Sequence, residues 1–370
     1  MRFPGFEGEW VLIKLRDIAE IKTGPFGSTL HAEDYVSDGT PIITTEHFKT
    51  GSLPIEKSGL PQVSPTDYLR LKSYRLSIND IVFSRVGSVD INAHVNKEQE
   101  GWLFSGRVLR VRPNSSINSN YLHWCLSTEK NRANIARRAV GQTMPSINTE
   151  ILNETELFIS DSHREQDKIA NILTLVDERI SIQNKVIKKY ESLIKALAYE
   201  NIGRYSPNTT LSECVQCSSS TIKEGDLFDS GTIPAYGASG ISGYMDNALS
   251  ENDSILITKD GSGFGSLRYV NGPHSFVGTL NSMTPKEGVY LPYIYYALQN
   301  VCFESYRTGQ AIPHIYFKDY GKETIYCPSL DNQKRLAKGL EMIDTKIGID
   351  RAVLHSLQSA KAYLLSAMFI

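Results

Sequence analysis

The sequence predicts an α+β fold: two mixed α/β domains separated by two long helices that form an antiparallel coiled coil, arranged as a pseudo-twofold tandem repeat. One helix-like segment occurs twice, so that Gln166 matches Gln333 and Ile180 matches Ile347 at one offset of 167 residues. Both copies carry apolar residues at alternating steps of three and four, the pattern of a heptad seam. A repeat this long indicates two whole domains rather than a solenoid.

Four segments follow from the repeat. The first mixed domain covers residues 1–160, and the first spacer helix covers residues 161–201. The second mixed domain covers residues 202–329, and the second spacer helix covers residues 330–370. A chain of 370 residues has room for two or three domains, each with its own hydrophobic core.

The heptad stripe of each long helix is interrupted by a polar residue at the same place. Gln183 is the polar member of the first copy and Asp350 that of the second, and we expect this pair to fix the register at some cost in stability. The stripe spans about 42 Å at 1.5 Å per residue. In the alternative interpretation, each helix packs on its own domain as an ordinary amphipathic helix. The seam positions are Ile169, Leu173, Val176, Ile180, Gln183, Ile187, Leu336, Leu340, Ile343, Ile347, Asp350 and Leu354.

Each mixed domain contains a strand pattern that runs into a glycine-serine turn. Residues 80–84 precede the turn at residues 86–88, and residues 253–258 precede the turn at residues 261–263. A further strand is expected in each half, at residues 108–111 and at residues 267–270.

Short helices are expected to follow, beginning near Tyr121 and near Tyr293. They run toward two Gly-Gln-x-x-Pro turns that start at Gly141 and Gly309. A glycine just past a helix, with a proline shortly after it, is typical of a helix end.

Composition and charge exclude several classes of protein. The hydrophobic fraction of 41% and charged fraction of 22% are typical of a soluble globular protein. We expect neither a transmembrane helix nor a signal peptide, and the odd number of cysteines, five, suits the reducing cytoplasm. The net charge is −2, and residues 201–329 hold 8 basic against 12 acidic side chains. If the chain binds DNA, the positive field must therefore come from local clusters or from a partner.

No catalytic motif survives inspection of the sequence. There is no Pro-Pro dipeptide, as the Asn/Asp-Pro-Pro-aromatic motif of amino methyltransferases requires, and no phosphate-binding loop ending in Gly-Lys-Ser/Thr. Residues 261–266 resemble a dinucleotide loop, but a strand pattern follows them, so a β-turn is the better interpretation. Cys214 and Cys217 form a lone C-x-x-C without a second ligand pair, so we expect no metal site. The chain is therefore predicted to be a recognition or scaffold component and not an enzyme.

The repeated motif resembles that of a known family. The segment Glu165-Gln166-Asp167-Lys168-Ile169-Ala170, at the start of the first long helix, is similar to the junction in specificity subunits of type I restriction-modification systems. The opening at residues 10–24 and the segment at residues 233–244 resemble the starts of the two target-recognition domains of that family. The second copy departs from the pattern, since Asn332 stands where Glu usually precedes the Gln.

The resemblance implies a division of labour. Each target-recognition domain is expected to read one half of a bipartite, asymmetric site in double-stranded DNA. The two helices are expected to space the halves and to carry two adenine-N6 methyltransferase subunits. S-adenosylmethionine would bind those partners and not this chain, and the family also allows restriction subunits in the complex. Half-sites on one face of B-DNA lie about 34–36 Å apart or a multiple of that, so the stripe length is of the right order.

Base readout needs polar or small side chains on exposed loops. In the first half the candidates for base contacts are Thr23, Gly24, Phe26, Ser28, Thr44, Thr45, Ser84, Arg85, Ser88, Gln142, Thr143 and Ser146. Three arginines expected on one helix suit phosphate contacts, namely Arg132, Arg137 and Arg138. The candidates in the second half are Ser218, Ser219, Lys223, Tyr236, Ser239, Lys259, Ser262, Gln310 and His314. For each of them the alternative is an ordinary solvated loop residue.

Two other functions remain open from the sequence. The chain could be a coiled-coil adaptor whose two globular domains bind proteins, or a single-chain nuclease or methyltransferase with a degenerate motif. A methyltransferase that co-purifies with the chain would separate the first hypothesis from the adaptor.

Overall fold

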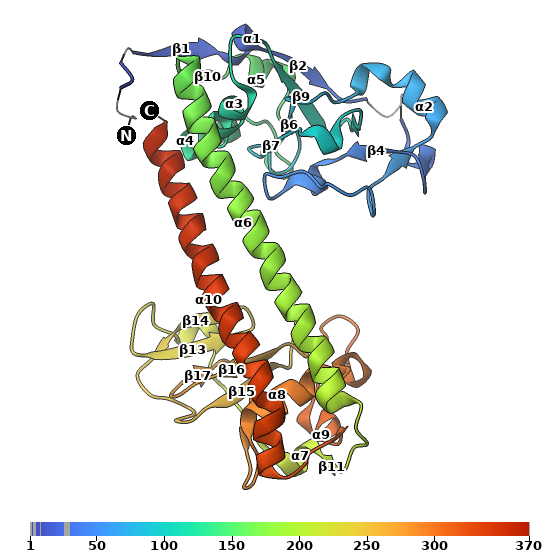
Figure 1. Cartoon of the computed structure of the whole chain (residues 1–370), viewed down its shortest axis with the longest axis vertical. Helices are drawn as coiled ribbons and strands as arrows, with labels where there is room; N and C mark the ends of the chain where they lie inside the picture. The colour runs from blue at the N-terminus through green and yellow to red at the C-terminus, as the bar shows by residue number, and fades with distance from the viewer. Residues whose placement is uncertain (1, 3–4, 8, 26–29, 370) are drawn as a thin grey trace. The chain divides into compact units, whose positions relative to one another are not determined.

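The computed structural model describes residues 2, 5–7, 9–25 and 30–369. The chain forms two compact units: unit 1 holds the chain up to Ile182 and from Leu354 onward, and unit 2 is Gln183–Val353. Both units therefore contain part of each long helix. The predicted boundaries instead make each long helix a segment separate from the mixed domains, and those boundaries stay a prediction. Figure 1 shows the elements of each unit.

The main sheet of unit 1 has the strand order β2-β9-β6-β7, and every neighbouring pair is antiparallel. All four residues of its inner strand β6 are buried, which confirms the strand predicted from this apolar run. The strand predicted at residues 108–111 is part of β9. The bounds are β2 Ala19–Thr23, β9 Val108–Pro113, β6 Ile81–Ser84 and β7 Asn92–His94.

Two smaller sheets complete the strands of unit 1. One has the order β3-β5-β4-β8, in which only β4 and β8 are parallel, and the other pairs β1 with β10. These strands are β1 Trp10–Lys14, β3 Tyr35–Val36, β4 Thr40–Ile43, β5 Gln62–Val63, β8 Leu103–Phe104 and β10 Glu156–Ser160. The short helices are α1 Leu15–Ile18, α2 Pro65–Arg70, α3 Ser119–Leu126, α4 Glu129–Arg137 and α5 Thr149–Asn153, with 3-10 turns η1 Ala32–Asp34, η2 Thr45–Phe48, η3 Lys72–Tyr74 and η4 Lys97–Gln99.

Side chains that favour helix N-termini start the helices of unit 1. The Asn118 side chain accepts a hydrogen bond from the Tyr121 amide at the start of α3, and Thr128 does the same for Asn131 in α4. Asn148 accepts from the Ile151 amide at the start of α5. Each cap satisfies an amide that has no partner inside its helix.

Unit 2 repeats this arrangement. Its main sheet has the order β12-β18-β15-β16, a second sheet has the order β14-β13-β17, and β11 pairs with β19. The strands are β11 Thr209–Thr210, β12 Val215–Ser219, β13 Ile233–Gly237, β14 Gly240–Met245, β15 Ser254–Thr258, β16 Leu267–Val270, β17 Ser275–Phe276, β18 Leu280–Pro285 and β19 Thr324–Ile325. The helices are α7 Leu211–Cys214, α8 Leu291–Ala297 and α9 Phe317–Tyr320, with a π-helical turn η5 Tyr199–Gly203 and 3-10 turns η6 Glu224–Asp226, η7 Leu298–Asn300 and η8 Phe303–Tyr306.

The two main sheets match in register, which identifies equivalent positions. Ile81 of β6 pairs with Val111 of β9, as Ile255 of β15 pairs with Met283 of β18. The two strands predicted at residues 108–111 and 267–270 both exist, but they are not counterparts. By position in the sheet, β9 corresponds to β18, and β7 corresponds to β16. Sheet partners are set by contacts between distant segments, so the sequence pattern did not reveal this correspondence.

The two long helices are α6 (His163–Ala198) and α10 (Leu330–Met368), as the repeat predicted. A buried glutamine ties the first turn of each helix to its own unit. Gln166 Oε1 accepts from the Asn118 amide at 2.8 Å, and Gln333 Oε1 accepts from the Tyr290 amide at 2.8 Å. The repeated glutamine thus joins each long helix to the short helix, α3 or α8, that packs beside it.

Every predicted seam position on the long helices is buried or half-buried. In unit 2 the predicted polar pair is in contact, since Gln183 Nε2 donates to the backbone carbonyl of Asp350 at 3.3 Å. In unit 1 the Lys361 ammonium lies 4.7 Å from the centroid of the Trp124 ring and forms an ion pair with Asp177. The coiled coil over the whole length of the helices stays a prediction.

Among the described residues, no helix is both long and apolar enough to cross a lipid bilayer.

Candidate nucleic-acid interface

Unit 1 brings two of the predicted loops together beside strand β6. The Gly87 amide donates to the Pro145 carbonyl at 2.9 Å, and the Ile147 amide donates to the Arg85 carbonyl at 2.9 Å. The turn that contains Ser88 therefore lies against the loop of Gln142, Thr143 and Ser146. Ser88, Gln142 and Thr143 are exposed, and Ser146 is half-buried.

Arg85 also lines a pocket of about 420 Å³ with Thr44 and Thr45. These two threonines precede and begin η2, and both are half-buried. Arg85 Nη1 donates to the Gly106 carbonyl at 2.9 Å, so the guanidinium is held at the pocket wall. Tyr35 lines the same pocket, where partial burial raises the pKa of its phenol.

Unit 2 builds the same frame from different residues. The Gly261 amide donates to the Pro313 carbonyl at 3.0 Å, and the Ile315 amide donates to the Lys259 carbonyl at 2.9 Å. Lys259 therefore occupies the position that Arg85 has in unit 1. The frame places the turn of Ser262 against the loop that holds Gln310 and His314.

The polar side chains of this second frame are arranged around His314. His314 Nδ1 lies 2.7 Å from Asp260 Oδ1, and its ring stacks on Tyr316 with centroids 6.4 Å apart. Ser262 and Gln310 are exposed, whereas Lys259 is half-buried. His314 is thus held in place and does not project freely from its loop.

The glycines of the two Gly-Gln-x-x-Pro turns do not end helices, so that expectation was wrong. α4 ends at Arg137, and Gly141 lies in a turn closed by the bridge between Val140 and Ser146. Gly309 lies in the equivalent turn, between Thr308 and His314. Both glycines have positive φ, 101° and 82°, and a Cβ at Gly309 would lie 2.4 Å from the Ile312 carbonyl oxygen. Glycine is needed for the turn itself.

Two further candidates of unit 1 are buried instead of exposed. Ser84 is the last residue of β6 and is 3% exposed, so its expected position on an exposed loop was wrong. Gly24 follows β2 and packs so closely that a Cβ there would lie 2.1 Å from the Ser105 carbonyl oxygen. Thr23, at the end of β2, is half-buried. Phe26 and Ser28 lie outside the described residues.

None of the three arginines proposed for phosphates lines the Arg85 pocket. Arg132 donates to the Asp90 carboxylate at 2.6 Å, which offsets its charge. Arg137 is exposed and ends α4, and Arg138 Nη1 donates to the Thr155 hydroxyl at 3.4 Å. Arg132 and Arg137 line a separate groove of about 1160 Å³. The structure therefore does not bring these three residues into the pocket that Arg85 lines.

Five candidates of unit 2 lie on β12, on β13 and in the loops that follow these strands. Ser218 and Ser219 are exposed on β12, and Ser219 Oγ donates to Asn281 Oδ1 at 2.8 Å. Lys223 is exposed and precedes η6, and Ser239 is exposed between β13 and β14. Tyr236 lies on β13, with the Arg268 guanidinium carbon 5.8 Å from its ring centroid. These residues are more dispersed than the group around Lys259.

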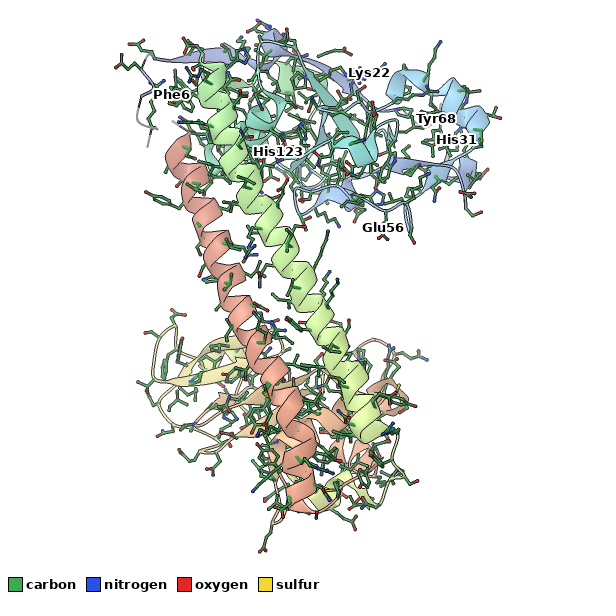
Figure 2. All side chains as sticks on the ribbon, in the orientation of Figure 1. Phe6, Lys22, His31, Glu56, Tyr68 and His123 are labelled. Atoms are coloured by element: carbon green, nitrogen blue, oxygen red, sulfur yellow. The ribbon has the colours of Figure 1, made fainter. Side chains whose placement is uncertain are left out.

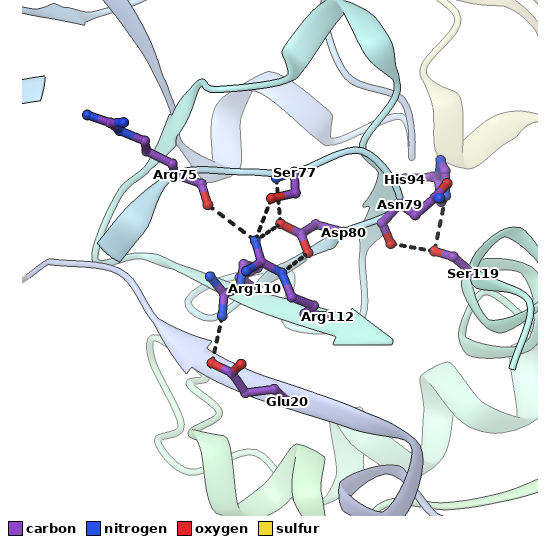
Figure 3. Close-up of polar contacts among 9 residues, drawn as sticks. All are labelled: Glu20, Arg75, Ser77, Asn79, Asp80, His94, Arg110, Arg112 and Ser119. Carbon is purple, nitrogen blue, oxygen red and sulfur yellow. Dashed lines mark hydrogen bonds and ion pairs between the residues drawn. The ribbon is translucent and has the colours of Figure 1, made fainter. Parts of the chain in front are cut away.

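Two other cations of unit 1 are paired with carboxylates at the main sheet. Arg112 donates from Nε and Nη2 to the carboxylate of Asp80, both at 2.7 Å, and Asp80 is 1% exposed (Figure 3). Arg110 donates to Glu20 at 2.7 Å, and burial lowers the pKa of Arg110. These ion pairs hold β9 beside β2 and β6, so neither arginine is a candidate for DNA contacts.

One cation that the sequence analysis missed does line the Arg85 pocket. Arg107 is exposed and lies in the turn between β8 and β9, where its backbone carbonyl accepts from the Arg85 amide at 3.0 Å. The short sequence Ser105-Gly106-Arg107 between two apolar runs is a turn pattern, and that pattern was the available indication.

The long helices also expose apolar side chains outside the seam. On α6, Leu175 and Ile182 are 63% and 52% exposed. On α10, Met342 and Ile349 are 68% and 56% exposed, and they stand at the same offset of 167 residues from Leu175 and Ile182. Residues seven apart lie on one face of a helix, so each unit exposes the same apolar face once.

Comparison with known proteins agrees with this arrangement. The model of the type I restriction modification DNA specificity domain matches residues 7–192 and 210–359. A protein of Mycoplasma genitalium named as a type I specificity subunit is 25% identical, with 68% of this chain and 71% of the relative covered. A Methanocaldococcus jannaschii protein named as the MjaX type I restriction enzyme specificity subunit is 25% identical, covering 97% of this chain and 92% of the relative.

Solved structures share the fold. The crystal structure of a type I restriction-modification S subunit from M. genitalium has a TM-score of 0.68 at 19% identity, and it covers 100% of this chain and 99% of its own. A chain from a structural study of complex assembly and conformational transition in the type I system has a TM-score of 0.51 at 14% identity, covering 98% of both chains.

Proposed function

Because this chain belongs to the family of type I restriction-modification DNA specificity subunits, we propose that its two mixed domains each read one half of a bipartite, asymmetric site in double-stranded DNA. The long helices space the two halves and dock two adenine-N6 methyltransferase subunits. The chain itself is non-catalytic, and S-adenosylmethionine binds the methyltransferase partners. The complex acts in the cytoplasm, and restriction subunits are further candidate partners.

The observation that carries the proposal is one frame built twice with different polar side chains. The same backbone bonds fix Arg85 in unit 1 and Lys259 in unit 2. Both loops present a glutamine at the matched position, Gln142 in unit 1 and Gln310 in unit 2. They differ elsewhere, since Thr143 stands where unit 2 has Ala311, and Ser146 stands where unit 2 has His314. A repeated scaffold supports recognition of two similarly placed half-sites, and different side chains support different sequences in the two halves.

The duplicated apolar face supports docking of two copies of one partner. Leu175 and Ile182 in unit 1 match Met342 and Ile349 in unit 2 by position and exposure. Two identical partners need two equivalent surfaces, and exposed apolar side chains seven residues apart suit an amphipathic helix. The low basic charge of the chain fits partners that supply phosphate contacts.

Methylome sequencing tests the DNA-reading part of the proposal. The chain is expressed with its methyltransferase subunit in a host without adenine methylation, and N6-methyladenine is mapped with and without this chain. We expect a bipartite motif only when the chain is present. If no motif appears, although the two proteins co-purify, the protein-binding adaptor becomes the better interpretation.

Co-purification tests the docking part. Ile182→Asp with Ile349→Asp places a charge on each proposed face, and we expect loss of the methyltransferase from the purified complex. Lys188→Asp with His355→Asp is the matched control, because these exposed residues lie on another face of the same helices at the same offset. Equal retention of the methyltransferase by both double variants contradicts docking at this face.

A further inference from the structure

The pocket beside Arg85 contains a second guanidinium, that of Arg107, whose main chain is fixed on both sides. The Arg107 carbonyl accepts from the Arg85 amide at 3.0 Å, and the next residue, Val108, is fully buried at the start of β9. Across the described ranges of the chain, no hydrogen bond or ion pair engages the Arg107 side chain. A rigid turn therefore presents to the pocket a planar donor group whose hydrogen-bonding capacity no described residue takes up, beside the carboxylate of Glu46.

The pocket wall also contains a buried hydroxyl without a partner. Ser105 is 8% exposed, and its Oγ makes no hydrogen bond to any described residue. The neighbouring Gly106 carbonyl is already occupied by Arg85 Nη1 at 2.9 Å. Since buried polar groups are almost always hydrogen-bonded, the unsatisfied hydroxyl indicates a site completed by a polar ligand or by water.

We propose that Arg107 reads a guanine in the half-site recognised by unit 1, inside the pocket that Thr44, Thr45 and Ser105 also line. This inference rests on the proposed function. A guanidinium that donates two parallel hydrogen bonds to O6 and N7 of guanine is the commonest specific contact in the major groove. A phosphate contact requires only an exposed cation, whereas Arg107 stands in a hollow of about 420 Å³ that hydroxyl groups and the Glu46 carboxylate line. That carboxylate disfavours a phosphate in the pocket.

Unit 2 lacks this donor at the matched position. The Lys259 amide donates to the Thr279 carbonyl at 2.9 Å, as the Arg85 amide donates to Arg107, so Thr279 replaces Arg107. Val277 likewise stands in the place of Ser105. The backbone amide of each residue donates at 2.9 Å to a carbonyl on a strand of the second sheet of its own unit. The guanine contact therefore belongs to one half-site only.

Methylome sequencing of variants in complex with the methyltransferase tests the proposal. For Arg107→Ala we expect the wild-type bipartite motif with one guanine position of one half made degenerate, with discrimination at that position reduced about 5- to 150-fold. Arg107→Lys keeps the charge but loses the bidentate geometry, so it should relax the same position and provides the test if the alanine variant does not fold. Arg70→Ala, in which an exposed arginine paired with Asp67 is removed, should leave the motif unchanged.

Two outcomes overturn the inference and differ from failure of the proposed function. An unchanged motif in both Arg107 variants, or a uniform loss of methylation with no relaxed position, means that Arg107 does not read a base. A wild-type complex that yields no bipartite motif refutes the proposed function, and the inference falls with it.

Discussion

The two units share a frame but differ in a pair of rings that packs between sheet and helix. In unit 1, His94 on β7 and His123 on α3 lie 6.3 Å apart between ring centroids, and His123 is labelled in Figure 2. The matched pair in unit 2 is Tyr269 on β16 and Tyr295 on α8, with centroids 5.9 Å apart. The same contact between sheet and helix is thus made by titratable bases in one unit and by phenols in the other.

This difference gives the two units different responses to acid. Burial lowers the pKa of His94, and burial together with the neighbouring His94 and Lys361 lowers the pKa of His123 well below its usual value. Burial raises the pKa of Tyr295 to about 12, so this ring stays neutral at any physiological pH. A shared fold therefore does not imply a shared stability profile, and substitutions at matched positions can test each unit against the other.

The largest expected effect comes from the central tyrosine of each core. Tyr121 and Tyr293 are fully buried at matched positions; the Tyr121 hydroxyl accepts from the Ser160 amide at 3.1 Å, and the Tyr293 hydroxyl donates to the Tyr326 carbonyl at 2.7 Å. Truncation to alanine leaves a cavity and an unpaired polar group, and should cost about 3–5 kcal/mol of unfolding free energy. Hydrogen exchange read by mass spectrometry should show faster exchange in β6 and β9 for Tyr121→Ala, and in β15 and β18 for Tyr293→Ala.

A matching tyrosine-to-phenylalanine pair controls for the cavity, since it removes only the hydrogen bond. If either alanine variant accelerated hydrogen exchange equally in both units, the two units would unfold together. That result would contradict the division of the chain into two units at Ile182.

The second largest effect is expected at the matched cations Arg85 and Lys259. Arg85→Ala or Lys259→Ala should weaken specific DNA binding by the assembled methyltransferase by about 1–3 kcal/mol if each contacts a base. A filter-binding titration at fixed salt measures this, with three DNAs: the wild-type motif and the motif with either half-site scrambled. Each variant should lose discrimination in a different half-site, because the residues belong to different units. An affinity that stays at the wild-type level removes the residue from the interface.

The sequence was sufficient for the features that depend on local periodicity. The long helices, the positions of Gln183 and Asp350 and the buried strand β6 follow from spacing along the chain alone. It was insufficient where distant segments meet. The burial of Ser84, the Arg107 side chain in the Arg85 pocket and the contact of His94 with His123 all depend on sheet order, and no local pattern encodes that order.

The smallest effect is the pH dependence of unit 1. A histidine whose pKa is lowered in the folded state binds protons mainly when unfolded, so its contribution to stability is complete above the unfolded pKa of about 6.5 and is lost as pH falls below it. Between pH 6.5 and 5.5 the loss is up to about 1.4 kcal/mol for each histidine. All three tryptophans, Trp10, Trp102 and Trp124, belong to unit 1, so urea unfolding followed by tryptophan fluorescence reports this unit alone.

We therefore expect the urea midpoint of the fluorescence transition to fall between pH 7.5 and 5.5. His123→Gln should flatten that dependence even if it lowers the midpoint at pH 7.5, because the amide cannot take up a proton. A midpoint that does not move between pH 7.5 and 5.5 would mean that the buried histidines gain compensating partners on protonation, and the two units would then respond to acid alike.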